Sequence, residues 1–145
     1  MTRSKRMQSV VEVTANRERD AARRLGDLQN REQAAVQRLE ELIRYREEYT
    51  QQFADGVSLP AARLQDYRVF LSRLNQAVEA QQTLVARARQ ECAAQRGRWL
   101  DIRSRVQALG KVALRYRDAE RDEHDRREQK ETDQRSSNTR KQDDD

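Results

Sequence analysis

The sequence predicts an all-α protein, a long two-helix antiparallel coiled-coil hairpin with an overhanging C-terminal helix. Of its 145 residues, 35% are hydrophobic and 38% are charged, a lean supply of apolar side chains for a globular core of this size. Four glycines and one proline are few for a disordered chain, and the common residues include Arg, Glu, Gln, Ala and Leu, all good helix formers. Apolar residues also recur in two long series with coiled-coil spacing.

The first series predicts a helix over about residues 7–53. Its apolar residues recur at alternating steps of three and four, the period that turns one seam of a helix toward a partner helix. Most of the seam positions are apolar when Ala and Tyr are included. The seam consists of Met7, Val11, Thr14, Glu18, Ala21, Leu25, Leu28, Glu32, Ala35, Leu39, Leu42, Arg46, Tyr49 and Phe53.

A short break at residues 54–59 separates the two series. Gly56 can adopt the left-handed conformation that closes a helix, and Ser58 can cap the next one. Pro60 then falls in the first helical turn, where its missing N–H does no harm. So short a link predicts that the helices pack antiparallel, with paired residue numbers that add up to about 115.

The second series predicts a helix over about residues 60–130. Gln81 and Gln95 are the two polar interruptions of an otherwise apolar seam. The seam consists of Leu64, Tyr67, Leu71, Leu74, Val78, Gln81, Val85, Ala88, Cys92, Gln95, Trp99, Ile102, Val106, Leu109, Ala113 and Tyr116.

The C-terminal part of this second helix is predicted to overhang. On the expected register, the first helix runs out near residue 108 of the second. The seam ends at Tyr116, and the residues that follow are nearly all charged or polar. We therefore expect one coiled-coil domain over residues 1–135 and a disordered charged tail over residues 136–145.

The sequence predicts no catalytic, cofactor or metal site, so we expect a protein that is not an enzyme. His124 is the only histidine, and no Cys, Ser or second His lies at ligand or nucleophile spacing from it. The glycines stand alone rather than in a phosphate-binding loop. No apolar run reaches the roughly 20 residues of a membrane span, and the lone Cys92 fits a reducing cytoplasm.

Some apolar residues are surplus to the seam. Tyr45 in the first helix and Phe70, Ala77 and Leu84 in the second each come directly before a seam residue. They share one heptad position beside the seam, and the expected register brings Tyr45 next to Phe70. Two interpretations stay open: these residues widen the core, or they form a partner surface, since a two-helix hairpin has no third element to cover them.

The chain is basic, with a formal net charge of +5. Between residues 87 and 117 many Lys and Arg side chains face only two acids, Glu91 and Asp101. This stretch is either a solvated face or a docking surface for an acidic or nucleotide-bearing partner. Interleaved acids and scarce aromatic residues weaken the interpretation as a nucleic-acid groove.

Two motifs resemble the flagellar FliJ protein family. The first is LIRYREEY at residues 42–49, and the second is YRVFLSRLNQAV at residues 67–78, with Gly56 between them. Trp99 and the segment EQKETD at residues 128–133 extend the resemblance over most of the chain.

The resemblance implies a soluble stalk of the flagellar type III protein export apparatus, similar to the central γ subunit of rotary ATPases. Such a protein would be cytoplasmic, located at the inner-membrane face of the flagellar base, and would serve motility and chemotaxis. Its partners would be the hexameric flagellar export ATPase, the export gate membrane protein and the export chaperones of late substrates. No nucleic acid, small-molecule substrate or cofactor is expected.

The resemblance also implies two sets of contact residues. The export gate is expected to contact Leu42, Tyr45, Tyr49, Phe70, Leu74, Ala77 and Gln81. The ATPase ring is expected to contact Arg17, Arg23, Arg24, Arg98, Arg103 and Arg105.

Two alternatives stay open. A stalk of a virulence-type III secretion system would have the same architecture and other partners. A basic coiled-coil protein that binds nucleic acid would show an affinity that falls steeply with salt.

Overall fold

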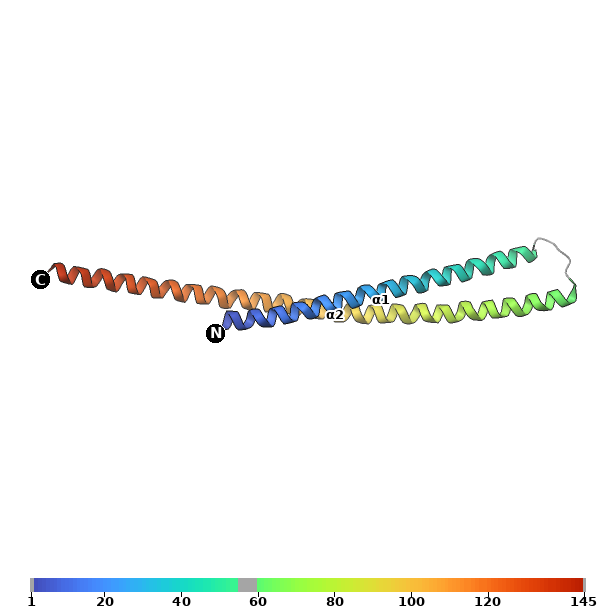
Figure 1. Ribbon diagram of the computed structural model, residues 1–145, viewed down its shortest axis with the longest axis horizontal. Helices are drawn as coiled ribbons and strands as arrows, with labels where there is room; N and C mark the ends of the chain where they lie inside the picture. Colours follow the sequence, from blue (N-terminus) through green and yellow to red (C-terminus); the bar gives the residue numbers. More distant parts are fainter. Residues whose placement is uncertain (1, 55–59, 145) are drawn as a thin grey trace. The chain divides into compact units, whose positions relative to one another are not determined.

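The computed structural model describes residues 2–54 and 60–144, and that part of the chain forms two helices (Figure 1). Helix α1 spans Arg3–Ala54 and has 52 residues. Helix α2 spans Ala61–Asp143 and has 83 residues. No strand occurs among the described residues. The predicted all-α fold of two long helices is therefore confirmed.

The N-terminal end of each helix is capped from the chain just before it. Helix α1 begins at Arg3 rather than near residue 7, because the Thr2 hydroxyl accepts the N–H of Lys5 at 3.4 Å. The Pro60 carbonyl accepts the N–H of Leu64 at 3.1 Å, so Pro60 directly precedes the helix and needs no N–H of its own. The expected roles of Gly56 and Ser58 lie outside the described residues.

The C-terminal end of α2 differs from the prediction. The helix does not end near residue 130, and the segment expected to be a disordered tail at 136–145 is helical as far as Asp143. A helix needs no tertiary partner where its own side chains support it. Arg127 pairs with Glu123 one turn back at 2.8 Å. Two basic residues, Arg140 and Lys141, lie in the last turn, where they suit the negative end of the helix dipole.

The contacts divide the chain into two compact units. Unit 2 is Asp20–Leu100, and unit 1 is made of Met1–Arg19 and Asp101–Asp145. Each unit contains a stretch of both helices, so each has its own helix pair. That residues 1–135 form a single domain stays a prediction. In neither helix is any described stretch both long and apolar enough to cross a membrane.

In unit 2 the two helices pack antiparallel along the predicted seam (Figure 1). Every described residue that is fully buried occupies a seam position, and the most deeply buried is Val78, at 2% exposure. The buried set is Ala21, Leu25 and Leu28 of α1 with Leu74, Val78, Val85, Cys92 and Gln95 of α2. The period of the sequence therefore located the core correctly.

The two polar interruptions of the seam are both hydrogen-bonded across it. The Gln81 Nε2 donates to the Ala35 carbonyl at 2.9 Å, and the Gln95 Nε2 donates to the Ala21 carbonyl at 3.1 Å. Gln95 is only 3% exposed. An alanine opposite each glutamine leaves the backbone carbonyl of α1 within reach of the amide, and both pairs match the expected register.

A shift of one heptad would break both hydrogen bonds. In one direction it would set Gln95 against Leu28 and Gln81 against Leu42, which are bulkier than the alanines and leave less room for the amides. A buried amide without a partner costs about 1–3 kcal/mol. The two glutamines therefore specify how α1 is aligned with α2.

Polar contacts beside the seam support the same alignment. The Arg89 Nε lies 3.5 Å from the Glu32 carboxylate. Cys92 is a free cysteine, buried next to this pair. Burial, together with a hydrogen bond to Glu32, raises the pKa of the Cys92 thiol. The thiol therefore stays protonated and acts as a small core side chain.

In unit 1 the first turn of α1 is held by α2. The Ser4 N–H and hydroxyl both donate to the Glu120 carboxylate, at 3.1 and 2.6 Å. We expected α1 to run out near residue 108 of α2, and this prediction is wrong. Helix α1 begins earlier, at Arg3, and the Glu120 side chain leans toward the N-terminus of α2, so the two helices remain in contact. From Arg121 onward the described residues are all exposed.

We expect the two seam glutamines to set alignment more than stability. Replacing both, Gln81→Leu with Gln95→Leu, should leave the melting temperature equal or higher, because leucine suits a seam, but should allow other alignments and oligomers. Light scattering should then report mixed masses for the double variant and a single mass for the unchanged chain. Gln95→Ala, which opens a cavity and removes the hydrogen bond, should instead cost about 1–3 kcal/mol in chemical denaturation. A double variant that keeps a single mass and sharp unfolding would contradict this role.

The Ser4–Glu120 contact should depend on pH. Hydrogen bonds from the Ser4 hydroxyl and N–H lower the pKa of Glu120 below its ordinary 4.5. Their contribution is therefore complete above pH 4.5 and is lost as the pH falls through the lowered pKa. Hydrogen exchange should show a protected Ser4 amide at pH 7 that loses its protection in acid, whereas in Glu120→Ala the Ser4 amide should be unprotected at both pH values. Glu123→Ala, whose carboxylate pairs with Arg127, should leave the Ser4 amide unchanged.

Candidate functional site

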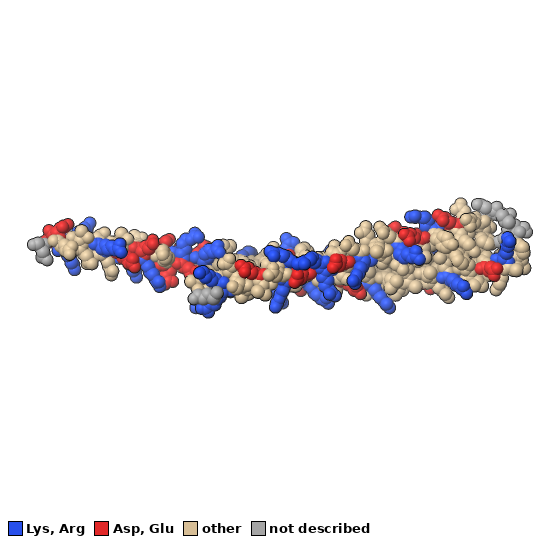
Figure 2. Space-filling model, viewed as in Figure 1, with Lys and Arg blue, Asp and Glu red and all other residues tan. Residues whose placement is uncertain are grey.

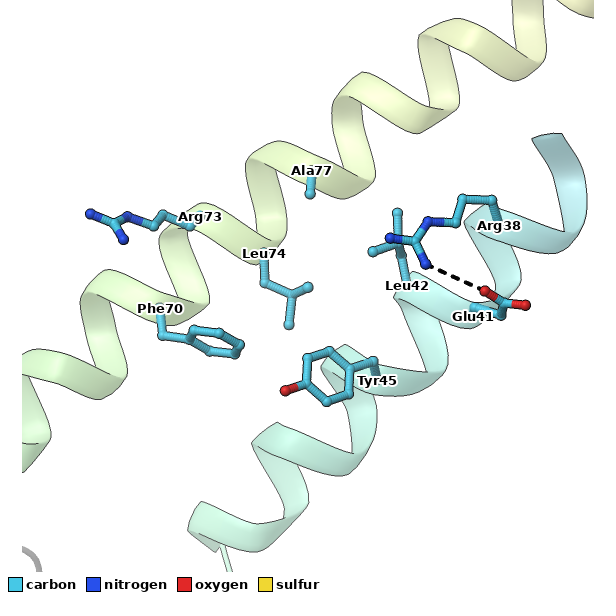
Figure 3. Close-up of a pocket in the computed structure, with 8 residues that line it drawn as sticks. All are labelled: Arg38, Glu41, Leu42, Tyr45, Phe70, Arg73, Leu74 and Ala77. Atoms are coloured by element: carbon cyan, nitrogen blue, oxygen red, sulfur yellow. Dashed lines mark hydrogen bonds and ion pairs between the residues drawn. The ribbon is translucent and has the colours of Figure 1, made fainter.

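An open groove of about 500 Å³ lies between the helices of unit 2, near the end of α1 and the start of α2 (Figure 3). We call it the aromatic groove. Five of the seven residues expected at the export-gate contact line it, with three charged residues at its edge. The lining residues are Arg38, Glu41, Leu42 and Tyr45 of α1 and Phe70, Arg73, Leu74 and Ala77 of α2.

The heptad pattern explains the layout of the aromatic groove. Leu42 and Leu74 are seam residues, and Leu74 is 6% exposed, so they form the floor. Tyr45 and Phe70 occupy the flank position, which in an antiparallel pair faces the same flank position of the other helix. Their rings meet edge to face, with centroids 6.1 Å apart and planes at 83°. This is a favoured geometry for two aromatic rings.

The two flank aromatics differ in how far they are covered. Tyr45 is 50% exposed. Phe70 packs against Tyr49 with ring centroids 4.5 Å apart, and Tyr49 in turn stacks on Tyr67 at 5.2 Å. Of the two interpretations left open for the flank residues, a widened core fits Phe70, because Phe70 is part of an aromatic cluster that ties α1 to α2. Tyr45 remains half exposed.

The edge of the aromatic groove is charged. The Arg38 Nη1 lies 3.4 Å from the Glu41 Oε2, and both side chains are about 60% exposed (Figure 3). An exposed pair one turn apart on a helix holds its partners weakly, so both groups are available to a docking chain. Figure 2 shows Lys, Arg, Asp and Glu side chains scattered among uncharged ones at this end of unit 2.

Two of the expected gate residues do not line the aromatic groove. The Gln81 amide donates into the seam, to the Ala35 carbonyl. Tyr49 lines a neighbouring groove with Asp66, Val69, Phe70 and Arg73. Tyr49 still contacts the aromatic groove through Phe70, with ring centroids 4.5 Å apart, whereas Gln81 is directed into the seam.

The six arginines expected at the ATPase ring are divided between the two units. Arg23, Arg24 and Arg98 belong to unit 2, and Arg17, Arg103 and Arg105 belong to unit 1. In unit 2 the Arg23 guanidinium pairs with Asp20 at 3.3 Å, and the Arg98 Nη1 donates to the Gln95 Oε1 at 3.4 Å.

Arg17 and Arg105 line a second groove, of about 410 Å³, within unit 1. We call it the basic groove; its other lining residues are Thr14, Ile102, Ala108 and Leu109. Sequence analysis did not foresee this groove. A signal was present, since Arg17 and Arg105 lie whole heptads away from Tyr45 and Phe70 and so share their flank position.

The histidine lies in a small exposed group on the overhanging part of α2. Ligand-type atoms of His124, Asp125 and Glu128 come within 4.8 Å of one another, and all three residues are exposed. The His124 Nδ1 is 3.8 Å from the Glu128 carboxylate, as is usual for residues one helical turn apart. Such groups are common on solvated helices and assign no chemistry to this one.

Comparison with known proteins relates the chain to a family. The family model described as Flagellar FliJ protein matches residues 3–142. No curated protein and no solved structure matches the chain.

Proposed function

The chain belongs to the flagellar FliJ protein family, whose members are stalk components of the flagellar export apparatus, and on that premise we propose that it links two partners in that apparatus. One partner is the export gate membrane protein, bound at the aromatic groove. The other is the hexameric export ATPase, bound through the arginines. We further propose that the protein works at the inner-membrane face of the flagellar base, binds export chaperones of late substrates, and is required for motility and chemotaxis.

The aromatic groove is the observation that carries the gate contact. Leu42, Tyr45, Phe70, Leu74 and Ala77 were assigned to that contact by resemblance, and in the structure they line one groove. Tyr45 is the exposed anchor, since half of its surface remains open to solvent. Aromatic side chains at the centre of a contact usually carry most of the binding energy.

The shape and charge of the aromatic groove define what it would bind. Its floor of Leu42, Leu74 and Ala77 suits an aliphatic or aromatic side chain inserted beside the Tyr45 ring. The charged residues at its edge would then orient the inserted segment through its polar groups. A single extended or helical segment of the gate protein, rather than a flat surface, is the expected occupant.

The ring contact rests on charge. Nine Lys and Arg residues against two acids lie between residues 87 and 117, and α1 adds further arginines near its start. The family match favours an acidic surface on the export ATPase over nucleic acid as their partner, and a flagellar stalk over a virulence-type one.

Tyr45→Ala should weaken binding to the export gate protein by about 2 kcal/mol, because it removes the exposed anchor of the contact. Isothermal titration of the purified gate protein would measure the loss, and swimming in soft agar should decline with it. Helicity and the melting temperature should change little, because Tyr45 is half exposed. Phe70→Ala should weaken binding too, but should also lower the melting temperature, since Phe70 packs on Tyr49.

Leu84→Ala is the matched control for Tyr45→Ala. Leu84 occupies the same flank position on α2 and is also 50% exposed, yet it does not line the aromatic groove. Its replacement should leave gate binding and swimming unchanged. Equal losses for Tyr45→Ala and Leu84→Ala, or no loss for either, would rule out the groove as the gate site.

The purified chain should raise the ATP hydrolysis rate of the hexameric export ATPase. Because the contact is proposed to depend on exposed arginines, the stimulation should decline as salt rises from about 50 to 300 mM. Tyr45→Ala, which lies far along α1 from these arginines, should stimulate as well as the unchanged chain. Stimulation that is absent, or insensitive to salt, would contradict an electrostatic ring contact.

A further inference from the structure

The basic groove of unit 1 combines two arginines with an apolar floor. Arg17 comes from α1 and Arg105 from α2, and both are exposed. Neither forms an ion pair within 4.0 Å among the described residues. Of the six arginines expected to bind the ring, these two come together at one groove.

The floor of the basic groove is apolar. Ile102 and Leu109 are half-buried seam residues that show one side to the groove, and Ala108 adds a methyl group. The Thr14 hydroxyl is already bonded to the Val10 carbonyl at 2.8 Å. Thr14 therefore needs no polar partner in the groove, and an apolar ligand group beside it meets no unsatisfied hydroxyl.

Exposed valines extend this apolar floor along α1. Val10 is 48% exposed and Val13 is 53% exposed. Val13 precedes Arg17 by one helical turn and Val10 precedes it by two, so both lie on the same side of the helix as Arg17. Exposed β-branched side chains next to an apolar groove favour a ligand with an aliphatic portion, longer than a single ion.

We propose that the basic groove is the docking site for a protein segment of the ATPase ring that carries a carboxylate beside aliphatic side chains. This inference rests on the proposed ring contact and specifies where it is made. The Arg17 and Arg105 guanidiniums bind the carboxylate, which suits their planar donor geometry, and the aliphatic side chains cover Ile102, Leu109 and the two valines. Closing the groove removes water from the ion pairs and strengthens them.

The lining of the basic groove disfavours a nucleic acid. No aromatic ring is among its six lining residues, so a base has nothing to stack on. A phosphate backbone would satisfy the arginines but would leave Ile102 and Leu109 uncovered. An acidic protein segment uses both the charge and the apolar floor.

Binding of the purified export ATPase hexamer to two charge-reversed double variants tests the proposal. The groove variant carries Arg17→Glu and Arg105→Glu. The control variant carries Arg19→Glu and Arg115→Glu, which lie in the same unit, are not among the residues that line the basic groove and change the net charge equally. Surface plasmon resonance should show at least a tenfold loss of affinity for the groove variant and less than about threefold for the control. Circular dichroism should show equal helicity in both.

A photo-cross-linker identifies the occupant directly. Benzoylphenylalanine at position 108, an exposed alanine of the groove, should capture a peptide of the ATPase with Asp or Glu next to Leu, Ile or Val. A single-stranded oligonucleotide or vesicles of anionic lipid should not reduce this cross-link at physiological salt.

Four results would overturn the proposal. Equal losses in the two double variants would mean that overall charge, not the groove, attracts the ring. A cross-linked peptide without acids, or a cross-link displaced by the oligonucleotide or the vesicles, would mean a different occupant. If the unchanged chain bound no ATPase, the proposed ring contact itself would be wrong. If the ATPase bound both double variants as tightly as the unchanged chain, the ring contact would stand but the basic groove would not be its site.

Discussion

The alignment of α1 with α2 depends on two hydrogen bonds, from Gln81 and Gln95 to alanine carbonyls across the seam. A seam made only of leucine, valine and alanine would let one helix slide along the other by a heptad at little cost, because apolar contacts have no direction. The glutamines remove that freedom, since their amides are satisfied opposite alanines. Each groove is built from side chains of both helices, so each exists only in this alignment.

Both grooves use one flank position of the heptad with different side chains. In unit 2 the position holds Tyr45 and Phe70 and produces an aromatic surface. In unit 1 it holds Arg17 and Arg105 and produces a basic one. The two surfaces therefore differ in flank side chains. Tyr45, Arg17 and Arg105 are exposed, whereas Phe70 also packs on Tyr49 of the other helix.

The sequence predicted the structural features that follow from a regular heptad period, but not those that depend on individual side-chain contacts. The buried residues, from Ala21 to Gln95, all occupy predicted seam positions because burial follows the 3.5-residue repeat. The length of α2 was underestimated, because local pairs such as Glu123 with Arg127 support a helix without leaving a periodic pattern. Residues 42–49 and 67–78 marked the aromatic groove. The sequence signal for the basic groove was only the flank position that Arg17 and Arg105 share, and no periodic pattern indicates the Ser4–Glu120 contact, which joins residues far apart in the chain.

The exposed end of α2 determines where the protein tolerates insertions and deletions. One residue added to or deleted from the paired part of α2 would rotate every later side chain by about 100° about the helix axis and turn the seam away from α1. Beyond Glu120 no seam remains to be misaligned, since the described residues there are all exposed. Relatives of this chain should therefore vary in length after residue 120 one residue at a time, but should gain or lose paired helix only in whole heptads.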